Sequence, residues 1–373
     1  MRKHFPNKKL TIADREELFN ERHHYLCDDN DVDIIYGEKY LENLNTYDLV
    51  IKAPGISFKN MNISFEDKIT SQLQMFLTFF KGKTIAVTGT KGKSTTSSLV
   101  YRVIEEQNSN TVLLGNIGAP IFDYLDELNE STNVVLETSS HQLQYVTKSP
   151  NISMILNIFE EHLDHYDSYE HYAYAKYNIF KFQKENDFAI YNMDNSVVRN
   201  MVDKGTLSSN LIGISFEDKD SASLFIKDNF VVYRENGDEI KLYNIYDDRK
   251  LIGNHNLFNI IFCLAICKIL NLDIPKAITT INDFEGLPHR MEFVGEFNQV
   301  KYYNDSIATI PEATIYCVEA LKDVNTLIIG GMDRKVDYSK FIDYLANSDI
   351  ENIICLPDVG TFIGDELLKI RKR

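Results

Sequence analysis

The chain has 373 residues, of which 44% are hydrophobic and 25% are charged, a composition typical of folded globular proteins. This length predicts two or three domains. Lysine and arginine total 39 against 55 aspartate and glutamate residues, which gives a net charge of −16. That balance excludes a nucleic-acid scaffold, because no basic excess is present to displace the counterions of a phosphate backbone. It does not exclude a phosphorylated small molecule, since a few lysines and backbone amides can hold one locally.

The cysteines and the N-terminus predict a cellular compartment. The 5 cysteines are scattered and include no C-x-x-C pair, so neither a zinc site nor a disulfide framework is indicated. Residues 1–10 are basic, but the charged segment 11–18 follows where a signal peptide needs an apolar core. The longest uncharged apolar stretch, residues 257–267, is too short to span a membrane. We therefore expect a soluble protein of the reducing cytoplasm that does not bind membranes.

Short β-rich runs alternate with helical patterns along the chain. Strands are predicted at residues 9–13, 47–52, 84–88, 133–137, 152–157, 187–191, 211–215, 326–330 and 352–356. Helices are predicted at residues 93–106, 168–183, 254–272 and 361–372. Repeated strand–helix–strand order predicts an α/β fold whose parallel sheets are covered on both faces. Residues 225–233 differ, because they predict an antiparallel hairpin that turns at Asp228 and Asn229.

Two glycine-containing segments predict domain boundaries. Lys81-Gly82-Lys83 precedes a very apolar strand, and Gly286-Leu-Pro-His-Arg290 interrupts a helical pattern. The expected domains are residues 1–80, 81–285 and 286–373.

The strongest motif is Thr88-Gly-Thr-Lys-Gly-Lys-Ser-Thr95, which stands between a predicted strand and a predicted helix. Glycines let successive backbone amides turn inward around an anion, and the helix adds its positive N-terminus. Lys93 can reach the terminal phosphates of a nucleotide, and Ser94 or Thr95 can bind Mg²⁺. A glycine-rich turn without function is the alternative, which the strand before it and the helix after it disfavour. The expected nucleotide-binding residues are Gly89, Thr90, Lys91, Gly92, Lys93, Ser94 and Thr95.

The loop is a shortened variant, because Val87 stands where the general Walker pattern has its first glycine. Further motifs follow it in order: Asn116-Ile-Gly118, Leu136-Glu-Thr-Ser-Ser140, Asn157-Ile-Phe-Glu-Glu-His-Leu-Asp164, Leu251-Ile-Gly-Asn-His-Asn256, Gly286-Leu-Pro-His-Arg-Met-Glu-Phe293, Tyr303-Asn-Asp-Ser306 and Gly330-Gly-Met-Asp333. In order and spacing, over essentially the whole chain, these motifs resemble the Mur ligases of peptidoglycan synthesis and their relative folylpolyglutamate synthase.

The resemblance implies a fold and an activity. The implied fold has three α/β domains, with a central P-loop ATPase built on a parallel sheet and Rossmann-like domains at both ends. The motifs are most similar to the branch of the family that adds D-glutamate to UDP-N-acetylmuramoyl-L-alanine. The implied substrates are therefore these two molecules, and the implied cofactors are ATP and Mg²⁺, with two metal ions. The resemblance also implies a monomeric enzyme. A folate-type polyglutamate ligase is disfavoured by Asp14, Arg15 and Asn116.

Amide formation fits the residues independently. A carboxylate must be activated before an amine can attack it, and phosphoryl transfer from ATP makes the acyl phosphate that does so. Charge then develops on phosphoryl oxygens, so positioned cations and Mg²⁺ matter more than a nucleophilic side chain. Glu137 ends a predicted buried strand beside the phosphate loop, at the sheet edge where such sites form, and is expected to bind the metal. A helix-capping or surface carboxylate is the alternative.

The resemblance adds His162 and Lys176 to the catalytic set. His162 has carboxylates on both sides and matches the family's metal- and substrate-binding histidine. Lys176 would be an ordinary surface lysine by composition, but it matches the family's carbamylated lysine. A neutral amine that captures CO₂ becomes an oxygen donor that suits Mg²⁺. The implied catalytic residues are Lys93, Glu137, His162 and Lys176, and the implied metal ligands are Ser94, Glu137, His162 and Lys176.

Three other histidines are expected to have no catalytic role. His165 and His171 match no family position and are expected at the surface, and His141 stands where relatives carry an aromatic residue and is expected to pack.

The remaining nucleotide contacts are also implied by family positions. Asn256 and Asn259 would contact the adenine end of ATP, with helix capping as the alternative. Arg290 would contact phosphate or ribose, and Asp305 would contact ribose or contribute to interdomain contacts.

The implied substrate-binding residues are Asp14, Arg15, Asn116, Ser139, His162 and Thr309. Asp14 and Arg15 match the family's uracil-recognition position, although a solvated acidic turn explains them almost as well. Ser139 and Ser140 have the alternative of capping the next helix.

The sequence departs from the family pattern at Asp305-Ser-Ile-Ala-Thr-Ile310. Ile307 replaces a lysine that helps to hold the carboxylate of the incoming glutamate. Because isoleucine cannot pair with a carboxylate, Thr309, Arg334 and Lys335 are the candidate replacements. A preference for L-glutamate and a harmless subfamily difference both remain open.

The chain also starts later and stops earlier than the family pattern. By the resemblance, we expect the glycine-rich loop that holds the UDP diphosphate and the serine/phenylalanine segment that binds glutamate to be missing, so both end domains are expected to be incomplete. An inactive relative that still binds nucleotide is therefore the rival function.

Overall fold

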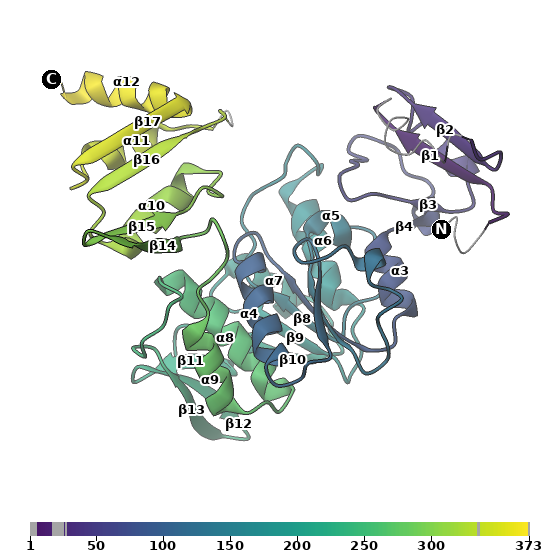
Figure 1. The fold of residues 1–373 in the computed structure, drawn as a ribbon. Coiled ribbons are helices and arrows are strands. Elements are labelled where there is room, and N and C mark those ends of the chain that lie inside the picture. The colour runs from purple at the N-terminus through teal and green to yellow at the C-terminus, as the bar shows by residue number, and fades with distance from the viewer. Residues whose placement is uncertain (1–5, 17–25, 27, 334–335, 372–373) are drawn as a thin grey trace. The chain divides into compact units, whose positions relative to one another are not determined.

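The computed structural model describes residues 6–16, 26, 28–333 and 336–371. It divides into two compact units, residues 1–71 and 72–373 (Figure 1). Among the described residues, no helix combines the length and the apolar character that a membrane crossing requires.

The first unit contains two small parallel sheets. β1 (Leu10–Asp14) pairs with β2 (Val32–Tyr36), and β3 (Val50–Ile51) pairs with β4 (Ile69–Thr70). Two 3-10 helices, η1 (Leu44–Thr46) and η2 (Glu66–Lys68), lie between these strands in the sequence. The predicted first strand is confirmed, one residue later than expected. The strand predicted at 47–52 is only two residues long.

The second unit is built on a nine-stranded sheet in the order β13-β12-β11-β10-β9-β8-β5-β7-β6. Its strands are β5 (Lys83–Thr88), β6 (Thr111–Gly115), β7 (Asn133–Glu137), β8 (Ile152–Ile155), β9 (Phe188–Asn192), β10 (Asn210–Ile214), β11 (Leu224–Lys227), β12 (Phe230–Glu235) and β13 (Asp238–Asn244). The strands from β6 to β11 are parallel, and β12 and β13 are antiparallel. The sheet is therefore mixed rather than wholly parallel.

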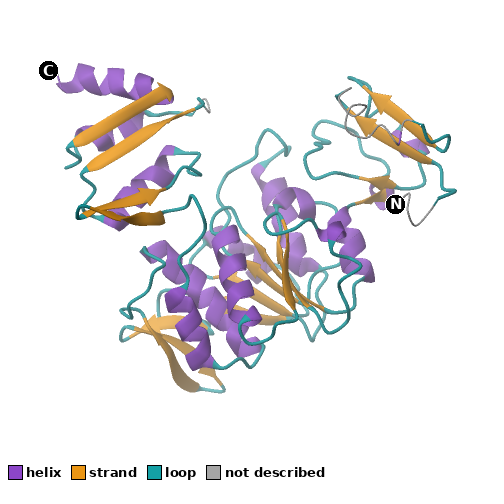
Figure 2. Cartoon of the chain, in the orientation of Figure 1, coloured by secondary structure: helices purple, strands orange, loops and turns teal. Residues whose placement is uncertain are grey.

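Helices cover both faces of this sheet, as predicted (Figures 1 and 2). One face packs against α4 (Lys93–Glu105), α8 (Asn254–Ile269) and α9 (Ile274–Asp283), and the other against α3 (Gln72–Phe79), α5 (Ser140–Leu143), α6 (Tyr169–Lys181) and α7 (Ser196–Lys204). Alternate residues of each strand point to opposite faces, so Ile85 and Val87 enter the first core while Ala86 enters the second. The short helix η3 (Ile121–Asp123) follows β6.

The predicted hairpin is confirmed between β11 and β12. Asp228 and Asn229 both have positive φ, 48° and 65°, as expected for the primed turns that match strand twist. β13 then adds a third antiparallel strand, which the sequence analysis did not predict.

The segment after residue 286 forms two further pairs of strands. β14 (Glu292–Phe297) and β15 (Val300–Asn304) make an antiparallel hairpin, while β16 (Thr326–Gly331) and β17 (Asn352–Asp358) are parallel. The helices here are α10 (Pro311–Leu321), α11 (Ser339–Ala346) and α12 (Val359–Arg371). These positions confirm the predicted strands at 326–330 and 352–356 and a helix over the described part of 361–372. The division into domains at 81 and 286 stays a prediction.

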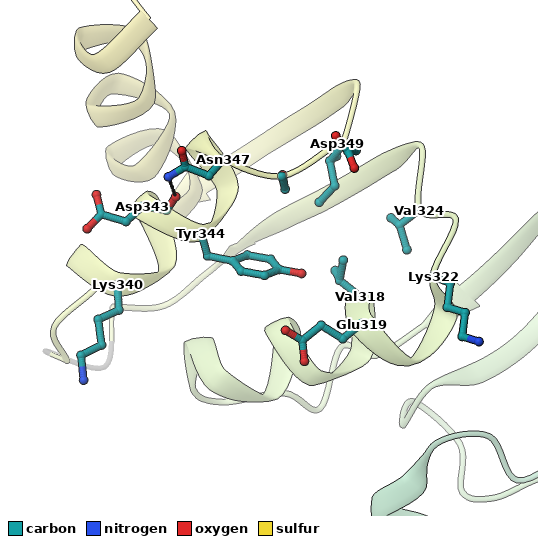
Figure 3. A pocket seen from close by; sticks show the side chains of 11 residues that line it. Val318, Glu319, Lys322, Val324, Lys340, Asp343, Tyr344, Asn347 and Asp349 are labelled. Atoms are coloured by element: carbon teal, nitrogen blue, oxygen red, sulfur yellow. Dashed lines mark hydrogen bonds between the residues drawn. The ribbon is translucent and has the colours of Figure 1, made fainter.

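A cavity of about 720 Å³ opens between α10 and α11, beside the residues that lead into β16 and β17 (Figure 3). Tyr344 and Val318 line it together with charges of both signs, including Glu319 and Lys322. It lies at the amino ends of the two strands, whereas ligands of open parallel sheets bind at the carboxyl ends. We assign no function to it.

Candidate active site

The candidate site lies where β5, β7 and β8 end, at the carboxyl edge of the central sheet. The glycine-rich loop joins β5 to α4, and Gly92 is the N-cap residue of that helix. Gly92 has φ of 85°, and a Cβ there would lie 2.9 Å from Oδ1 of Asn259. Any larger residue would therefore be strained and crowded, which explains why the loop needs glycine at this position.

The Lys93 side chain folds back over the loop. Its Nζ donates hydrogen bonds to the carbonyl oxygens of Gly89 at 2.9 Å and Thr90 at 3.0 Å. Burial lowers the pKa of Lys93, although Glu137 and Glu161 act in the opposite direction. Of the two following residues, Thr95 is buried and Ser94 is half-buried in the first turn of α4. The loop, the lysine and the helix N-terminus thus meet as an anion site requires.

Asn157 anchors the loop from the end of β8, a role that the sequence analysis missed. Its Oδ1 accepts a hydrogen bond from the Lys91 amide at 2.8 Å, and its Nδ2 donates to the Lys91 carbonyl at 3.0 Å. Its own carbonyl accepts from the Thr90 amide at 2.9 Å. The sequence did contain an indication of this role, because Asn157 follows a buried strand that neighbours the strand before the loop.

A second anchor joins the loop to α6 through Tyr172. The Tyr172 hydroxyl and Thr90 Oγ1 are 2.9 Å apart, and Thr90 Oγ1 also accepts a hydrogen bond from the Phe159 amide at 2.9 Å. Tyr172 is fully buried, and burial raises the pKa of its hydroxyl. The hydroxyl therefore stays protonated and can serve as a neutral hydrogen-bonding group.

Lys176 is buried, so the surface position suggested by composition is wrong. Only 2% of the residue is exposed, and its Nζ donates to the Gly89 carbonyl at 2.8 Å. The same nitrogen lies 4.8 Å from the centre of the Tyr172 ring. Burial, and then the charge of Lys93, holds the pKa of Lys176 well below its ordinary value. A buried amine whose charged form is disfavoured therefore stands against the phosphate loop.

Glu137 is buried at the end of β7, with 1% of the residue exposed, and is not a surface or capping carboxylate. Its Oε1 accepts a hydrogen bond from Nδ2 of Asn116 at 2.9 Å. Its Oε2 is buried and has no hydrogen-bond partner among the described residues. A buried carboxylate oxygen without a partner is costly unless a cation occupies its position.

This carboxylate fits Mg²⁺ better than a metal that needs a protein cage. No group of three or more histidine, cysteine, aspartate or glutamate side chains in the described ranges could by itself hold a metal ion. Mg²⁺ is commonly bound through one or two carboxylates, with phosphates and water completing its shell. Glu137 next to a phosphate loop is such an arrangement.

His162 belongs to a group of packed aromatic rings beside the loop. Its φ is 59°, its side chain is 44% exposed, and Nε2 lies 3.7 Å from the Glu161 carboxylate. The His141 ring lies 4.8 Å from His162 and 4.1 Å from His165, which confirms the expected packing role of His141. The surface position expected for His165 is wrong, because only 9% of it is exposed. His171 is exposed, as expected.

The structure shows which of three polar residues cap a helix. Ser139 caps α5 in a capping box with Gln142. Asn256 and Asn259 do not cap α8, because Gly253 is its N-cap residue. Both asparagines are buried, and Oδ1 of Asn259 accepts a hydrogen bond from the hydroxyl of Thr96 in α4 at 3.0 Å. They lie against the phosphate-binding helix.

The expected residues of the first unit lie at the surface. Asp14 and Arg15 are exposed at the end of β1, and Oδ1 of Asp14 accepts a hydrogen bond from the Glu16 amide at 2.9 Å. The turn is solvated and both side chains are accessible, so uracil recognition by Asp14 and Arg15 stays a prediction.

Further expected residues come from the C-terminal segment, and the charge of one of them, Arg290, acts on Lys93. Arg290 is half-buried, and Asp305 accepts a hydrogen bond from the Met291 amide at 3.0 Å. Burial raises the pKa of Asp305. Ile307 is 49% exposed, and Thr309 is also exposed. Arg334 and Lys335 lie outside the described residues.

Comparison with known proteins identifies the family. Residues 87–267 match the Mur ligase middle domain. The chain is 34% identical over 347 residues to UDP-N-acetylmuramoylalanine–D-glutamate ligase of Acetivibrio thermocellus. The matched region covers 92% of this chain and 72% of that protein. The chain belongs to the Mur ligases. The ligase of the same name from Clostridium kluyveri is 35% identical over 340 residues, 89% of this chain and 71% of that protein.

Solved Mur ligases share the fold. UDP-N-acetylmuramate-alanine ligase MurC of Thermotoga maritima has a TM-score of 0.60 at 20% identity and covers 97% of this chain and 88% of its own. MurF ligase of Thermotoga maritima in complex with ADP has a TM-score of 0.59 at 18% identity, with 95% and 83% coverage. As a Mur ligase, the chain is an ATP-dependent amide ligase of peptidoglycan precursor synthesis.

Proposed function

We propose that this Mur ligase joins D-glutamate to UDP-N-acetylmuramoyl-L-alanine and releases ADP and phosphate. The ligase names of the relatives at 34% and 35% identity support this substrate pair. The observation that carries the chemistry is the buried Glu137 Oε2, which has no hydrogen-bond partner among the described residues and lies at the strand end beside a phosphate loop that contains Lys93. Phosphoryl transfer needs this combination of a carboxylate for a divalent cation and a positioned lysine.

The loop and Lys93 bind and orient the ATP phosphates. The amides of Thr90 and Lys91 are held by Asn157, so the backbone amides at the N-terminus of α4 would face the anion. Lys93 would neutralise charge on the transferred phosphoryl group. The substrate carboxylate attacks the γ-phosphorus, the bond to the β,γ-bridging oxygen breaks, and ADP leaves. Asn256, Asn259, Arg290 and Asp305 would hold the adenosine part of the nucleotide.

The metal would be held by Glu137, with Ser94, His162 and a modified Lys176 as further ligands. When bound, Mg²⁺ supplies charge neutralisation at the phosphate oxygens. The neutral amine of Lys176 attacks CO₂, forms a C–N bond and loses a proton, which leaves a carbamate with oxygen donors. Its burial and lowered pKa support this modification, because only the unprotonated amine reacts.

The second half of the reaction needs no enzyme nucleophile. The glutamate amine attacks the acyl phosphate carbon, an amide bond forms, phosphate leaves and the amine loses a proton. His162, Asn116 and Ser139 would orient the acyl end of the UDP substrate, while Asp14 and Arg15 would bind its uracil.

L-glutamate is a second candidate acceptor, which Ile307 favours. This side chain stands where the family has a lysine, and half of it is exposed. An exposed isoleucine offers no charge to the glutamate carboxylate, so the acceptor site differs from the family pattern around this residue.

One assay tests the substrate assignment. The chain receives UDP-N-acetylmuramoyl-L-alanine, ATP and Mg²⁺ with either D-glutamate or L-glutamate, and the dipeptide product and released phosphate are measured. We expect product with D-glutamate. Product with L-glutamate alone would overturn the stereochemistry. Nucleotide binding without product from either isomer would establish the inactive relative instead.

A further inference from the structure

The turn after β6 brings Asn116 against the end of β7. Nδ2 of Asn116 donates a hydrogen bond to Glu137 Oε1 at 2.9 Å, and the Asn116 amide donates to the Glu137 carbonyl at 3.0 Å. Asn116 is therefore bound to both the main chain and the side chain of Glu137, although the two residues are 21 positions apart in the sequence.

Two glycines make this approach possible. Gly115 has φ of 112°, and a Cβ there would lie 2.4 Å from the Glu137 carbonyl oxygen. Gly118 has φ of 79°, and a Cβ there would lie 2.3 Å from the Leu113 carbonyl oxygen. Both distances are shorter than any side chain allows, so the turn presses its backbone against the strand ends only because it has glycine at both positions.

The two oxygens of Glu137 consequently differ. Oε1 is fixed by the Asn116 amide, while Oε2 is buried and has no hydrogen-bond partner in the described part of the chain. The backbone on the other side is fixed as well, because the amide and the hydroxyl of Thr138 both donate to the Val87 carbonyl, at 2.9 and 3.1 Å. The carboxylate therefore has one defined orientation.

We infer that Asn116 is a positioning residue for the metal carboxylate: it fixes Oε1 of Glu137 and so leaves Oε2 available to a divalent cation. This inference rests on the metal site of the proposed function and adds a residue that acts through Glu137. Hydrogen bonds from outer partners orient metal ligands, and their loss typically weakens metal affinity by about 10–100-fold.

The family resemblance assigns Asn116 to substrate binding, and the two roles predict different measurements. Asn116 is an exposed residue, so a substrate could also reach it. A substrate contact would change the affinity for the UDP substrate and leave metal affinity unaltered. A positioning role changes metal affinity even when no UDP substrate is present.

The experiment measures Mn²⁺ binding to the full chain by electron paramagnetic resonance, with ADP present and UDP substrate absent. The variants are Asn116→Ala, which removes the donor, and Asn116→Asp, which replaces it with a charge that repels Glu137. Asn210→Asp is the matched control, because this exposed residue begins β10 and so lies at the amino ends of the parallel strands, away from the candidate site. ADP binding without metal verifies that each variant is folded.

We expect Mn²⁺ dissociation constants about 10–100-fold higher for Asn116→Ala, still higher for Asn116→Asp, and unchanged for Asn210→Asp. Glu137→Gln distinguishes a failure of the proposed metal site from a failure of the positioning role of Asn116. If Glu137→Gln binds Mn²⁺ like the unmodified chain, the proposed metal site itself is wrong. If Glu137→Gln loses Mn²⁺ while both Asn116 variants bind it normally, the positioning role is wrong and the metal site stands.

Discussion

Side chains are more deeply buried at the carboxyl edge of the central sheet than in the small sheet of the C-terminal segment. At the central edge, Glu137, Lys176 and Tyr172 are buried. Lys176 and Tyr172 make hydrogen bonds to the phosphate loop, and Glu137 accepts one from Asn116. In the pair β16–β17, one face packs against helices while the other exposes Ile328 and Leu356. The parallel arrangement is the same in both places, but the packing around it is not.

This difference in burial decides in which region the structure restricts the chemical roles of individual residues. A buried polar group must be paired, so its position reports what surrounds it. The central edge consequently restricts the roles of Glu137 and Lys176 closely. In the C-terminal segment, Ile307 and Thr309 are exposed, so their surroundings restrict the acceptor amino acid only weakly.

The largest effect is expected from Lys93. Lys93→Met removes the cation that neutralises the transferred phosphoryl group, and we expect kcat to fall by about 10³-fold. Lys91→Met is the matched control, because Lys91 lies two residues away, is half-exposed and pairs with Glu161 at 2.9 Å. ADP formation measures both variants. Equal losses would show that the loop needs general positive charge and not the geometry of Lys93.

Stability sharpens the comparison between the two sheets. Leu264 in α8 is fully buried against the central sheet, so Leu264→Ala should lower the free energy of unfolding by about 2–5 kcal/mol. Ile328 of β16 is 61% exposed, and Ile328→Ala should change it by less than about 0.5 kcal/mol. Denaturant titration of each variant measures both. A large loss for Ile328→Ala would mean that this face is covered in solution.

Lys176 is expected to show a smaller, CO₂-dependent effect. Removing bicarbonate from the assay should slow the reaction, and adding it back should restore the rate, because the neutral amine must be carbamylated. Lys176→Met should lower activity by about 10–100-fold and respond to neither change. Activity that is unaffected by bicarbonate depletion in the unmodified chain would argue against the modification.

The smallest effect concerns the link between the loop and α6. Tyr172→Phe removes the hydroxyl that contacts Thr90 and should raise the KM for ATP about fivefold, as expected for one hydrogen bond of about 1 kcal/mol. Tyr174→Phe on the exposed side of the same helix should leave it unchanged. In the Thr90→Val background, which also loses the bond from the Phe159 amide, Tyr172→Phe should have no further effect, because its partner hydroxyl is already absent. Full additivity would show that the two side chains act independently.

The sequence predicted the elements of the central sheet best. Its strands are short apolar runs bounded by turn residues, and the phosphate loop lies between one of them and a helix, so pattern and motif agree. The third antiparallel strand, β13, was missed, because its first four residues are exposed and carry no apolar alternation. Prediction was thus most reliable where burial imposes a pattern.

The candidate site was predictable as a set of residues but not as a set of contacts. Lys93 and Lys176 bind the same loop and the charge of Glu137 acts on Lys93, while the roles of the three residues stay predictions. The burial of His165 and the hydrogen bonds by which Asn157 anchors the loop could not be predicted from the sequence. Both depend on residues that the order of strands in the sheet brings together.

The most direct test of the central claim follows the oxygen that links the two half-reactions. UDP-N-acetylmuramoyl-L-alanine with ¹⁸O in its carboxylate is supplied with ATP, Mg²⁺ and glutamate, and the released phosphate is analysed by mass spectrometry. Activation through an acyl phosphate predicts that one labelled oxygen passes to phosphate for each amide bond formed. Amide product with unlabelled phosphate would contradict the account.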